Sequence, residues 1–177
     1  MSMHYLSTLF TPNSLAVFGA SDRKNAVGEV VFRNILSAGY EGKVYPINPK
    51  HEQIQGLKAY KTLSDIHEPI DLAVVATPAK TIPAIVEACG EHGIKMMLIL
   101  SAGFREIGPA GRRLEDEVTK LAKSYGIRLM GPNCLGLIRP QKKLNITFGY
   151  NNAMQGNIAL VSQSGAICTA ILDWAEA

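Results

Sequence analysis

Residues 19–28 combine a glycine, a hydroxyl side chain and two cations directly after a short apolar run, a pattern that suits phosphate binding. Gly19 opens the stretch and would let the backbone approach a ligand closely. Ser21, Arg23 and Lys24 supply a hydroxyl donor and two positive charges. Backbone N–H groups at the start of the following helix would complete the anion site. The G-x-G-x-x-G spacing of dinucleotide-binding loops is missing, so phosphate binding and a merely structural turn both stay open.

A lysine follows the second apolar run, near the position at which dinucleotide-binding folds place an acidic residue. The run ends in Ile47-Asn48-Pro49-Lys50, and an acid here would hold the ribose hydroxyls of NAD. Lys50 instead favours a phosphorylated ribose, as in the 3′-phosphate of coenzyme A or the 2′-phosphate of NADP. An exposed lysine without a ligand explains the residue equally well.

Two further turns follow apolar runs. Thr77 suits a helix N-cap and Pro78 the first helical position, yet the same place is the edge at which ligands of doubly wound sheets lie. Ser101 and Gly103 open a second small-residue turn. Both turns can be explained by structure alone or by a ligand.

Residues 131–136, Gly-Pro-Asn-Cys-Leu-Gly, impose an unusual backbone. Cys134 is a weak candidate nucleophile, because no histidine lies near it in sequence and nothing obvious would lower the pKa of its thiol. Ser164 and Gly165 precede a helical pattern. They indicate either a second anion site at a helix start or a plain serine N-cap.

Short apolar runs must position these turns. Most are continuous, as in strands that are covered on both faces of a parallel sheet. The runs occupy residues 15–18, 44–47, 72–76, 96–100, 127–130 and 158–161. Stretches with apolar side chains at helical spacing separate them, apart from residues 56–66, which predict only a short strand and a helical turn. This rhythm predicts an α/β fold with a Rossmann-like, doubly wound, mainly parallel sheet.

The pattern changes after residue 130. Residues 137–146 predict irregular β structure or a hairpin, and residues 156–161 predict a new strand before a last amphipathic helix. One strand and one helix cannot make a domain. We therefore expect a first domain over residues 1–140, and a connecting segment with the start of a truncated second domain over residues 141–177.

Composition bounds the function. The chain of 177 residues is 47% hydrophobic and carries a net charge of +3, which is typical of a globular protein. Its basic residues are scattered among acids, so nucleic acid is not an expected partner. Three cysteines and four histidines show neither a disulfide framework nor metal-ligand spacing. With no signal peptide and no membrane-spanning run, a cytoplasmic location without metal or membrane binding is expected.

Together, the turns resemble those of the NDP-forming acyl-CoA synthetase superfamily, which includes the succinyl-CoA synthetase α subunit. The matching motifs, in order, are Gly-Ala-Ser at 19–21, Asn-Pro-Lys at 48–50, Ala-Thr-Pro at 76–78, Ser-Ala-Gly-Phe at 101–104, the six residues 131–136 and Ser-Gln-Ser-Gly at 162–165. The last two are the specific part. The resemblance implies an N-terminal CoA-binding domain and then a flavodoxin-like domain, whose first helix binds phosphate near Ser164 and Gly165.

The resemblance also implies a reaction. An acid, coenzyme A and ATP would exchange with acyl-CoA, ADP and phosphate. The phosphorylated histidine of that mechanism would lie beyond residue 177, because none of the four histidines of this sequence matches it. We therefore expect no catalytic residue here, no turnover by this chain alone, ATP and ADP bound only through other parts of the parent protein, and the remaining synthetase domains as partners.

The resemblance further assigns parts of coenzyme A, or of acyl-CoA, to the turns. Gly19, Ala20 and Ser21 would meet the phosphates, with Arg23 as a nearby cation. Lys50 would approach the ribose 3′-phosphate.

The remaining turns would hold the two ends of the ligand. Thr77 and Pro78 would line the adenosine side. Ser101, Gly103 and Asn133 would border the path of the pantetheine arm.

Two alternatives stay open. Some relatives fuse this region to a GNAT acetyltransferase domain that acts on protein lysines, and residues 170–175 resemble that subgroup, in which the region would sense acyl-CoA. An NAD(P)-binding redox domain is the further alternative, although the glycine spacing and Lys50 count against it.

Overall fold

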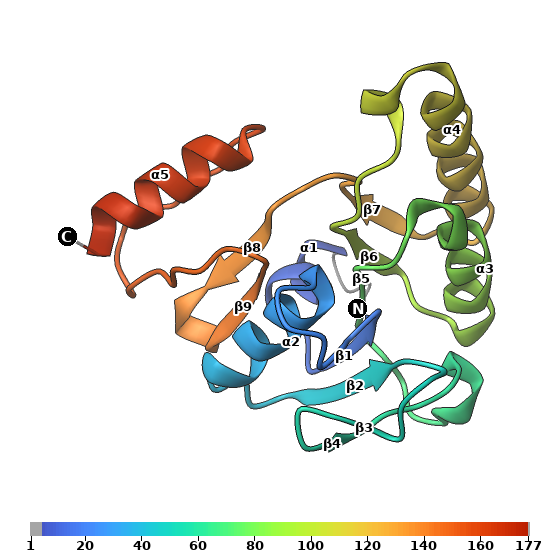
Figure 1. Cartoon of the computed structure of the whole chain (residues 1–177), viewed down its shortest axis with the longest axis horizontal. Helices are drawn as coiled ribbons and strands as arrows, with labels where there is room; N and C mark the ends of the chain where they lie inside the picture. The colour runs from blue at the N-terminus through green and yellow to red at the C-terminus, as the bar shows by residue number, and fades with distance from the viewer. Residues whose placement is uncertain (1–4, 177) are drawn as a thin grey trace.

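A five-stranded parallel sheet forms the centre of the computed structural model, which describes residues 5–176 (Figure 1). Its strands stand in the order β2-β1-β5-β6-β7, and all four neighbouring pairs are parallel. Their bounds are β1 Ser14–Phe18, β2 Lys43–Ile47, β5 Leu72–Val75, β6 Met96–Ile99 and β7 Arg128–Met130. The predicted α/β, Rossmann-like fold is thus confirmed.

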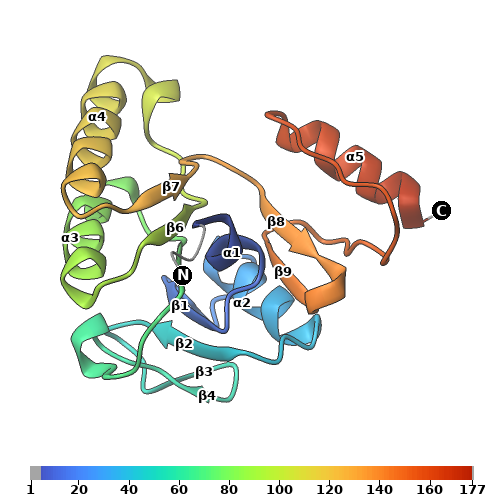
Figure 2. The same cartoon turned by 180° about the vertical axis from the view of Figure 1, so that it is seen from behind.

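Helices cover both faces of the sheet (Figures 1 and 2). They are α1 Tyr5–Phe10, α2 Val27–Ser37, α3 Ile82–His92 and α4 Pro109–Ser124. Because side chains of a strand alternate between faces, Leu15 and Val17 join the apolar cluster that contains Phe32 of α2. Ala16 and Phe18 point the other way and join the cluster under α3 and α4. Burial on both faces explains why the strands are continuous apolar runs.

Two small hairpins accompany the central sheet. One consists of β3 Gln53–Ile54 and β4 Leu57–Lys58, and the other of β8 Gly136–Arg139 and β9 Leu144–Thr147. The second confirms the β structure expected over residues 137–146. Asn34 of α2, which is buried, donates its Nδ2 protons to the carbonyl oxygens of Thr147 (2.8 Å) and Gly149 (2.7 Å). That amide anchors β9, and the chain that leaves it, on α2.

The strand expected over residues 158–161 does not form. These residues have no regular secondary structure, and the side chains of Ile158 and Val161 are almost fully exposed. A parallel strand needs a neighbour for its backbone hydrogen bonds, and no described strand pairs with this segment. The expected helix does form, as α5 Gly165–Glu176, and it extends away from the sheet beyond the β8–β9 hairpin (Figure 1). Residues 1–4 and 177 of the two expected domains lie outside the described residues, and the division at residue 140 stays a prediction.

Candidate functional site

The order of the strands reverses direction at β1. The chain passes from β1 to β2 on one side, and the next sheet strand, β5, lies on the other side of β1. In open α/β sheets a crevice opens at such a switch point, beyond the carboxyl ends of the strands. Here a cleft of about 980 Å³ occupies that place. It is lined by the loops after β1, β2 and β5, by residues 61–63, by the start of α2 and by the first two turns of α3. We call it the carboxyl-edge cleft.

Gly19 turns the chain at the end of β1 with φ +84°. Its N–H donates to the carbonyl oxygen of Ile47 at the end of β2 (3.2 Å). A Cβ on Gly19 would lie 2.7 Å from the carbonyl oxygen of Ala76, which follows β5. The loop therefore crosses the ends of both neighbouring strands so closely that only a residue without a side chain fits.

Gly28, in the first turn of α2, makes an even closer approach. A Cβ on Gly28 would lie 1.8 Å from the carbonyl oxygen of Gly19, so the helix begins directly against the turn. Sequence reasoning missed this residue. The sequence did hold a signal for it. Glycine lowers the stability of a helix relative to alanine, so a glycine in the first turn indicates that close packing excludes a side chain there.

The start of α2 is open toward the carboxyl-edge cleft. Its N-cap is Ala26, which has no side-chain oxygen for capping, and Val27 and Gly28 line the cleft. The first N–H groups of a helix have no acceptor within the helix, and they carry the positive end of the helix dipole. Ser21 and Arg23 line the same cleft. This arrangement suits an anion.

The hydroxyl of Ser21 stabilises the loop and can still donate a hydrogen bond. Its Oγ accepts a hydrogen bond from the N–H of Arg23 (3.0 Å), which leaves the hydroxyl proton able to donate to a ligand. Ala20 is buried and is not among the described residues that line the cleft, so its expected phosphate contact stays a prediction. Lys24 is not among the described residues that line the cleft.

Two side chains to which sequence reasoning gave no role hold the loop after β1 in place. Asn48 donates its Nδ2 proton to the carbonyl oxygen of Ala20 (2.9 Å), and its Oδ1 accepts the N–H of Lys50 (2.9 Å). Gln55, in the β3–β4 turn, donates Nε2 protons to the carbonyl oxygens of Ser21 (3.3 Å) and Glu29 (3.0 Å). The three contacts with carbonyl oxygens span 26 to 34 residues of sequence, so no local pattern could reveal them.

Positive side chains gather in the carboxyl-edge cleft. Arg23, Lys50 and Lys61 line it, and no acidic side chain does so among the lining residues that the structure describes. Lys50 follows the end of β2, as the sequence predicts, and lines the same cleft as Gly19. A site with this charge favours an anionic ligand.

Thr77 and Pro78 also line the cleft, but the predicted capping is wrong. Residues Ala79–Thr81 form a 3₁₀ turn before α3, so Pro78 is the N-cap of that turn and Thr81 the N-cap of α3. The Oγ1 atoms of Thr77 and Thr81 lie 2.9 Å apart. The extra turn shifts the helix start by several residues and leaves Thr77 and Pro78 at the edge of the cleft.

Ser101, Gly103 and Asn133 form a group beside the carboxyl-edge cleft but do not line it. The N–H of Asn133 donates to the carbonyl oxygen of Ser101 (3.0 Å). A Cβ on Gly103 would lie 3.0 Å from the Cβ of Ala79, just after Pro78. The group therefore adjoins the cleft at the loop after β5.

Glu106 fixes the turn that contains Gly103. Its carboxylate accepts the N–H groups of Gly103 (2.5 Å) and Phe104 (3.1 Å). The first of these bonds, chiefly, holds the pKa of Glu106 below its ordinary value.

Cys134 does not suit nucleophilic catalysis. Its Sγ donates to the carbonyl oxygen of Ile99 (3.4 Å), and burial raises the pKa of the thiol to about 11. The thiolate is the reactive form, so the residue is a packing contact between β6 and the turn at residues 131–136.

Ser164 and Gly165 lie at the start of α5, outside the carboxyl-edge cleft. The Oγ of Ser164 accepts the N–H of Ile167 (3.3 Å), as an N-cap does. The side chain is therefore engaged in capping the helix, while the phosphate role expected for this pair stays a prediction.

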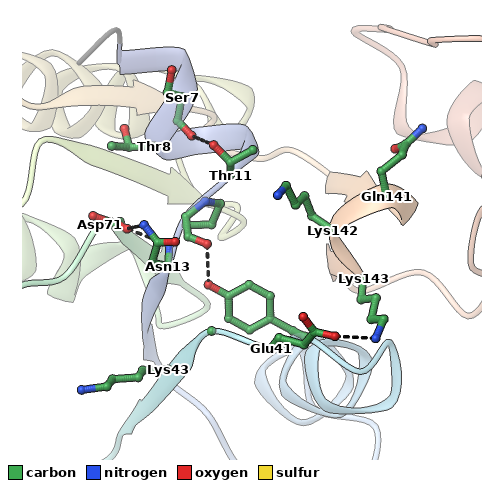
Figure 3. A pocket seen from close by; sticks show the side chains of 13 residues that line it. Ser7, Thr8, Thr11, Asn13, Glu41, Lys43, Asp71, Gln141, Lys142 and Lys143 are labelled. Carbon is green, nitrogen blue, oxygen red and sulfur yellow. Dashed lines mark hydrogen bonds and ion pairs between the residues drawn. The ribbon is translucent and has the colours of Figure 1, made fainter. Parts of the chain in front are cut away.

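A second cleft, of about 650 Å³, lies at the opposite, amino edge of the sheet (Figure 3). Asn13 and Asp71, which precede β1 and β5, face each other there, and the Asp71 carboxylate accepts the backbone N–H (2.7 Å) and the Nδ2 (3.2 Å) of Asn13. Lys143 pairs with Glu41 at 2.5 Å. Much of the charge in this amino-edge cleft is thus paired internally, in contrast to the carboxyl-edge cleft.

Within residues 5–176, no group of three or more His, Cys, Asp or Glu side chains is placed to hold a metal ion. None of the helices described there is long and apolar enough to cross a membrane.

Comparison with known proteins identifies similar chains. The CoA-binding domain family matches residues 13–140. The α subunit of acetate–CoA ligase (ADP-forming) I from Pyrococcus furiosus is 40% identical over 173 residues, which cover 96% of this chain and 37% of the relative. The 4-hydroxybutyrate–CoA ligase (ADP-forming) of Nitrosopumilus maritimus is 41% identical over 173 residues, covering 97% of this chain and 25% of the relative.

A solved structure agrees with this similarity. Dinucleotide-forming acetyl-coenzyme A synthetase 1 from Candidatus Korarchaeum cryptofilum, in complex with phosphate and ADP, superposes with a TM-score of 0.90 at 40% identity. The match covers 96% of this chain and 36% of that protein. The chain thus spans between a quarter and somewhat more than a third of the length of these similar proteins.

Proposed function

Because this chain belongs to the CoA-binding domain family, we propose that its carboxyl-edge cleft binds coenzyme A or acyl-CoA. The observation that carries the proposal is the open start of α2, fixed against the turn at Gly19 by the close approach of Gly28. Helix starts of this kind bind phosphate groups through free N–H groups and the helix dipole. The cationic lining of the cleft supports an anionic ligand.

In this proposal the loop after β1 meets the diphosphate. Gly19 and Ala20 provide backbone, the hydroxyl of Ser21 donates, and Arg23 supplies charge. Lys50, at the end of β2, reaches the ribose 3′-phosphate. The shared lining of one cleft by Gly19, Ser21, Arg23 and Lys50 supports this assignment.

The other ligand groups follow from the neighbouring loops. Thr77 and Pro78 line the adenosine side of the cleft. The pantetheine arm passes the group Ser101, Gly103 and Asn133, which adjoins the cleft next to Ala79. This path carries the thiol of coenzyme A away from β2 and toward β7, at the other side of the sheet.

We propose that the parent protein is an ADP-forming acyl-CoA synthetase, which converts an acid, coenzyme A and ATP to acyl-CoA, ADP and phosphate. The ADP-forming ligases among the relatives support this reaction. The present chain holds coenzyme A and is inactive alone, while other domains bind ATP or ADP and carry the phosphorylated group. Ser164 and Gly165 would bind phosphate with those domains. The acyl group is open, since the relatives act on acetate and on 4-hydroxybutyrate by name.

A cytoplasmic location completes the proposal. Three unpaired cysteines, Cys89, Cys134 and Cys168, support a reducing compartment.

Calorimetric titration of the 177-residue chain tests the binding proposal. We expect saturable heat with coenzyme A at one site per chain. No heat from a chain shown to be folded by circular dichroism would refute coenzyme A binding. An NADPH fluorescence change that coenzyme A cannot reverse would favour a redox domain instead.

A further inference from the structure

Tyr60 runs beside the end of β2 as a short extension of the sheet. It forms a parallel bridge with Ile47, its N–H donates to the carbonyl oxygen of Pro46 (2.9 Å), and its own carbonyl oxygen accepts the N–H of Asn48 (2.9 Å). The next residue, Lys61, therefore follows this extension at the carboxyl edge of the sheet, where the loop with Lys50 also lies. The two lysines are eleven positions apart in sequence.

The side chain of Tyr60 points away from the carboxyl-edge cleft. Its ring packs edge-on against Tyr45, with 5.7 Å between the centroids, and it lies against the apolar cluster under α3. Lys61, the next residue, is exposed and lines the cleft.

The chain after Lys61 is held by a local cap. The carboxylate of Asp65 accepts the N–H of Thr62 (2.9 Å) and its hydroxyl (3.0 Å). Lys61 contributes to the lowered pKa of Asp65, but hydrogen bonds from Thr62 are the larger causes. Asp65 is thus committed to the cap, and it is not among the described residues that line the cleft.

The two positive charges of Lys50 and Lys61 indicate which ligand group they would bind together. A phosphomonoester carries between about −1.5 and −2 at neutral pH and three acceptor oxygens, so one lysine does not neutralise it. Coenzyme A has one such group, on its ribose, whereas dephospho-coenzyme A has none.

We propose that Lys61 binds the ribose phosphomonoester of coenzyme A together with Lys50, and that it determines the preference for coenzyme A over ligands that lack this phosphate. The inference rests on the proposed function, because it concerns a second contact within the same cleft.

The test compares two ligands on two variants of the chain. Lys61→Met keeps the aliphatic stem and removes the charge. Lys58→Met is the matched control, because Lys58 is a nearby exposed lysine whose Nζ lies 5.1 Å from the centroid of the Tyr60 ring and which does not line the cleft. Calorimetry measures the affinity of each for coenzyme A and for 3′-dephospho-coenzyme A.

We expect the wild-type chain to bind coenzyme A more tightly than dephospho-coenzyme A. Lys61→Met should bind coenzyme A about tenfold more weakly than wild type, as for the loss of a charge-assisted contact. The affinity of Lys61→Met for dephospho-coenzyme A should equal that of wild type. Lys58→Met should change neither affinity, and Lys61→Arg should retain most of the preference.

An equal loss for both ligands, or no loss for either, would overturn the role of Lys61. Equal affinity of wild type for the two ligands would overturn it too, together with the phosphate contact proposed for Lys50, and leave coenzyme A binding by the cleft standing. Failure of wild type to bind either ligand would refute the proposed function itself.

Discussion

The carbonyl oxygen of Gly19 occupies the space that a side chain on Gly28 would need, 1.8 Å from the position of its Cβ. This contact joins the end of the first sheet strand to the first turn of α2 and aims the open end of the helix at the carboxyl-edge cleft. The strict dinucleotide-binding spacing is missing from the loop, yet the close helix–strand approach that such spacing serves is present.

Gly28→Ala should therefore destabilise the chain, by about 1–3 kcal/mol as for overpacked sites, and weaken coenzyme A binding. Equilibrium urea unfolding and calorimetry measure the two effects. Gly156→Ala is the control, because a Cβ there would meet nothing within 4 Å. Alanine normally favours a helix over glycine by about 1 kcal/mol, so unchanged or increased stability of Gly28→Ala would contradict the contact.

Asn48→Ala should weaken coenzyme A binding while the chain stays folded. The substitution removes the side chain that ties the carbonyl oxygen of Ala20 to the N–H of Lys50. One lost hydrogen bond of about 1 kcal/mol corresponds to roughly a fivefold weaker affinity. Asn157→Ala, at an exposed residue away from the cleft, should bind like wild type. Unchanged affinity in Asn48→Ala would show that the two loops need no such tie.

Asn34→Ala should lower the free energy of unfolding by about 1–3 kcal/mol, because it leaves two carbonyl oxygens, those of Thr147 and Gly149, without their buried donor. Urea unfolding measures the loss, again with Asn157→Ala as the control. Hydrogen exchange should become faster in β9. A loss of stability without faster exchange in β9 would mean that Asn34 does not anchor the hairpin.

Cys134 should react slowly with iodoacetamide. With a pKa of about 11, only about a thousandth of the thiol is ionised at pH 8. The folded-state pKa lies above the value of about 8.5 for a free thiol, so the stabilisation linked to this proton is complete below pH 8.5 and is lost as the pH rises toward 11. Mass spectrometry at pH 8 and pH 10 follows the alkylation. Rapid alkylation at pH 8, or loss of coenzyme A binding in Cys134→Ser, would contradict a packing role.

The strands were predictable because strands that are buried on both faces appear in the sequence as continuous apolar runs, as in Leu72–Val75. The same pattern gave a wrong prediction over residues 158–161, where the apolar run has no described strand to pair with. Apolar composition marks a need for burial, but a strand also requires a partner for its backbone.

The lining of the carboxyl-edge cleft was predictable where a loop directly follows a strand, as at Gly19, Lys50 and Thr77. It was not predictable where distant segments meet, as with Gln55, which reaches back to the loop at Ser21. Hydrogen bonds of this kind depend on how the elements pack, so they leave no periodic signal in the sequence.

The most direct test of the central claim locates coenzyme A on the chain by amide chemical-shift perturbation in nuclear magnetic resonance. Saturating coenzyme A should shift the amide signals of Gly19, Val27 and Gly28, at the open start of α2 in the carboxyl-edge cleft. Perturbation confined to the amino-edge cleft, at Thr11 and Lys142, or no perturbation at saturation, would contradict the account.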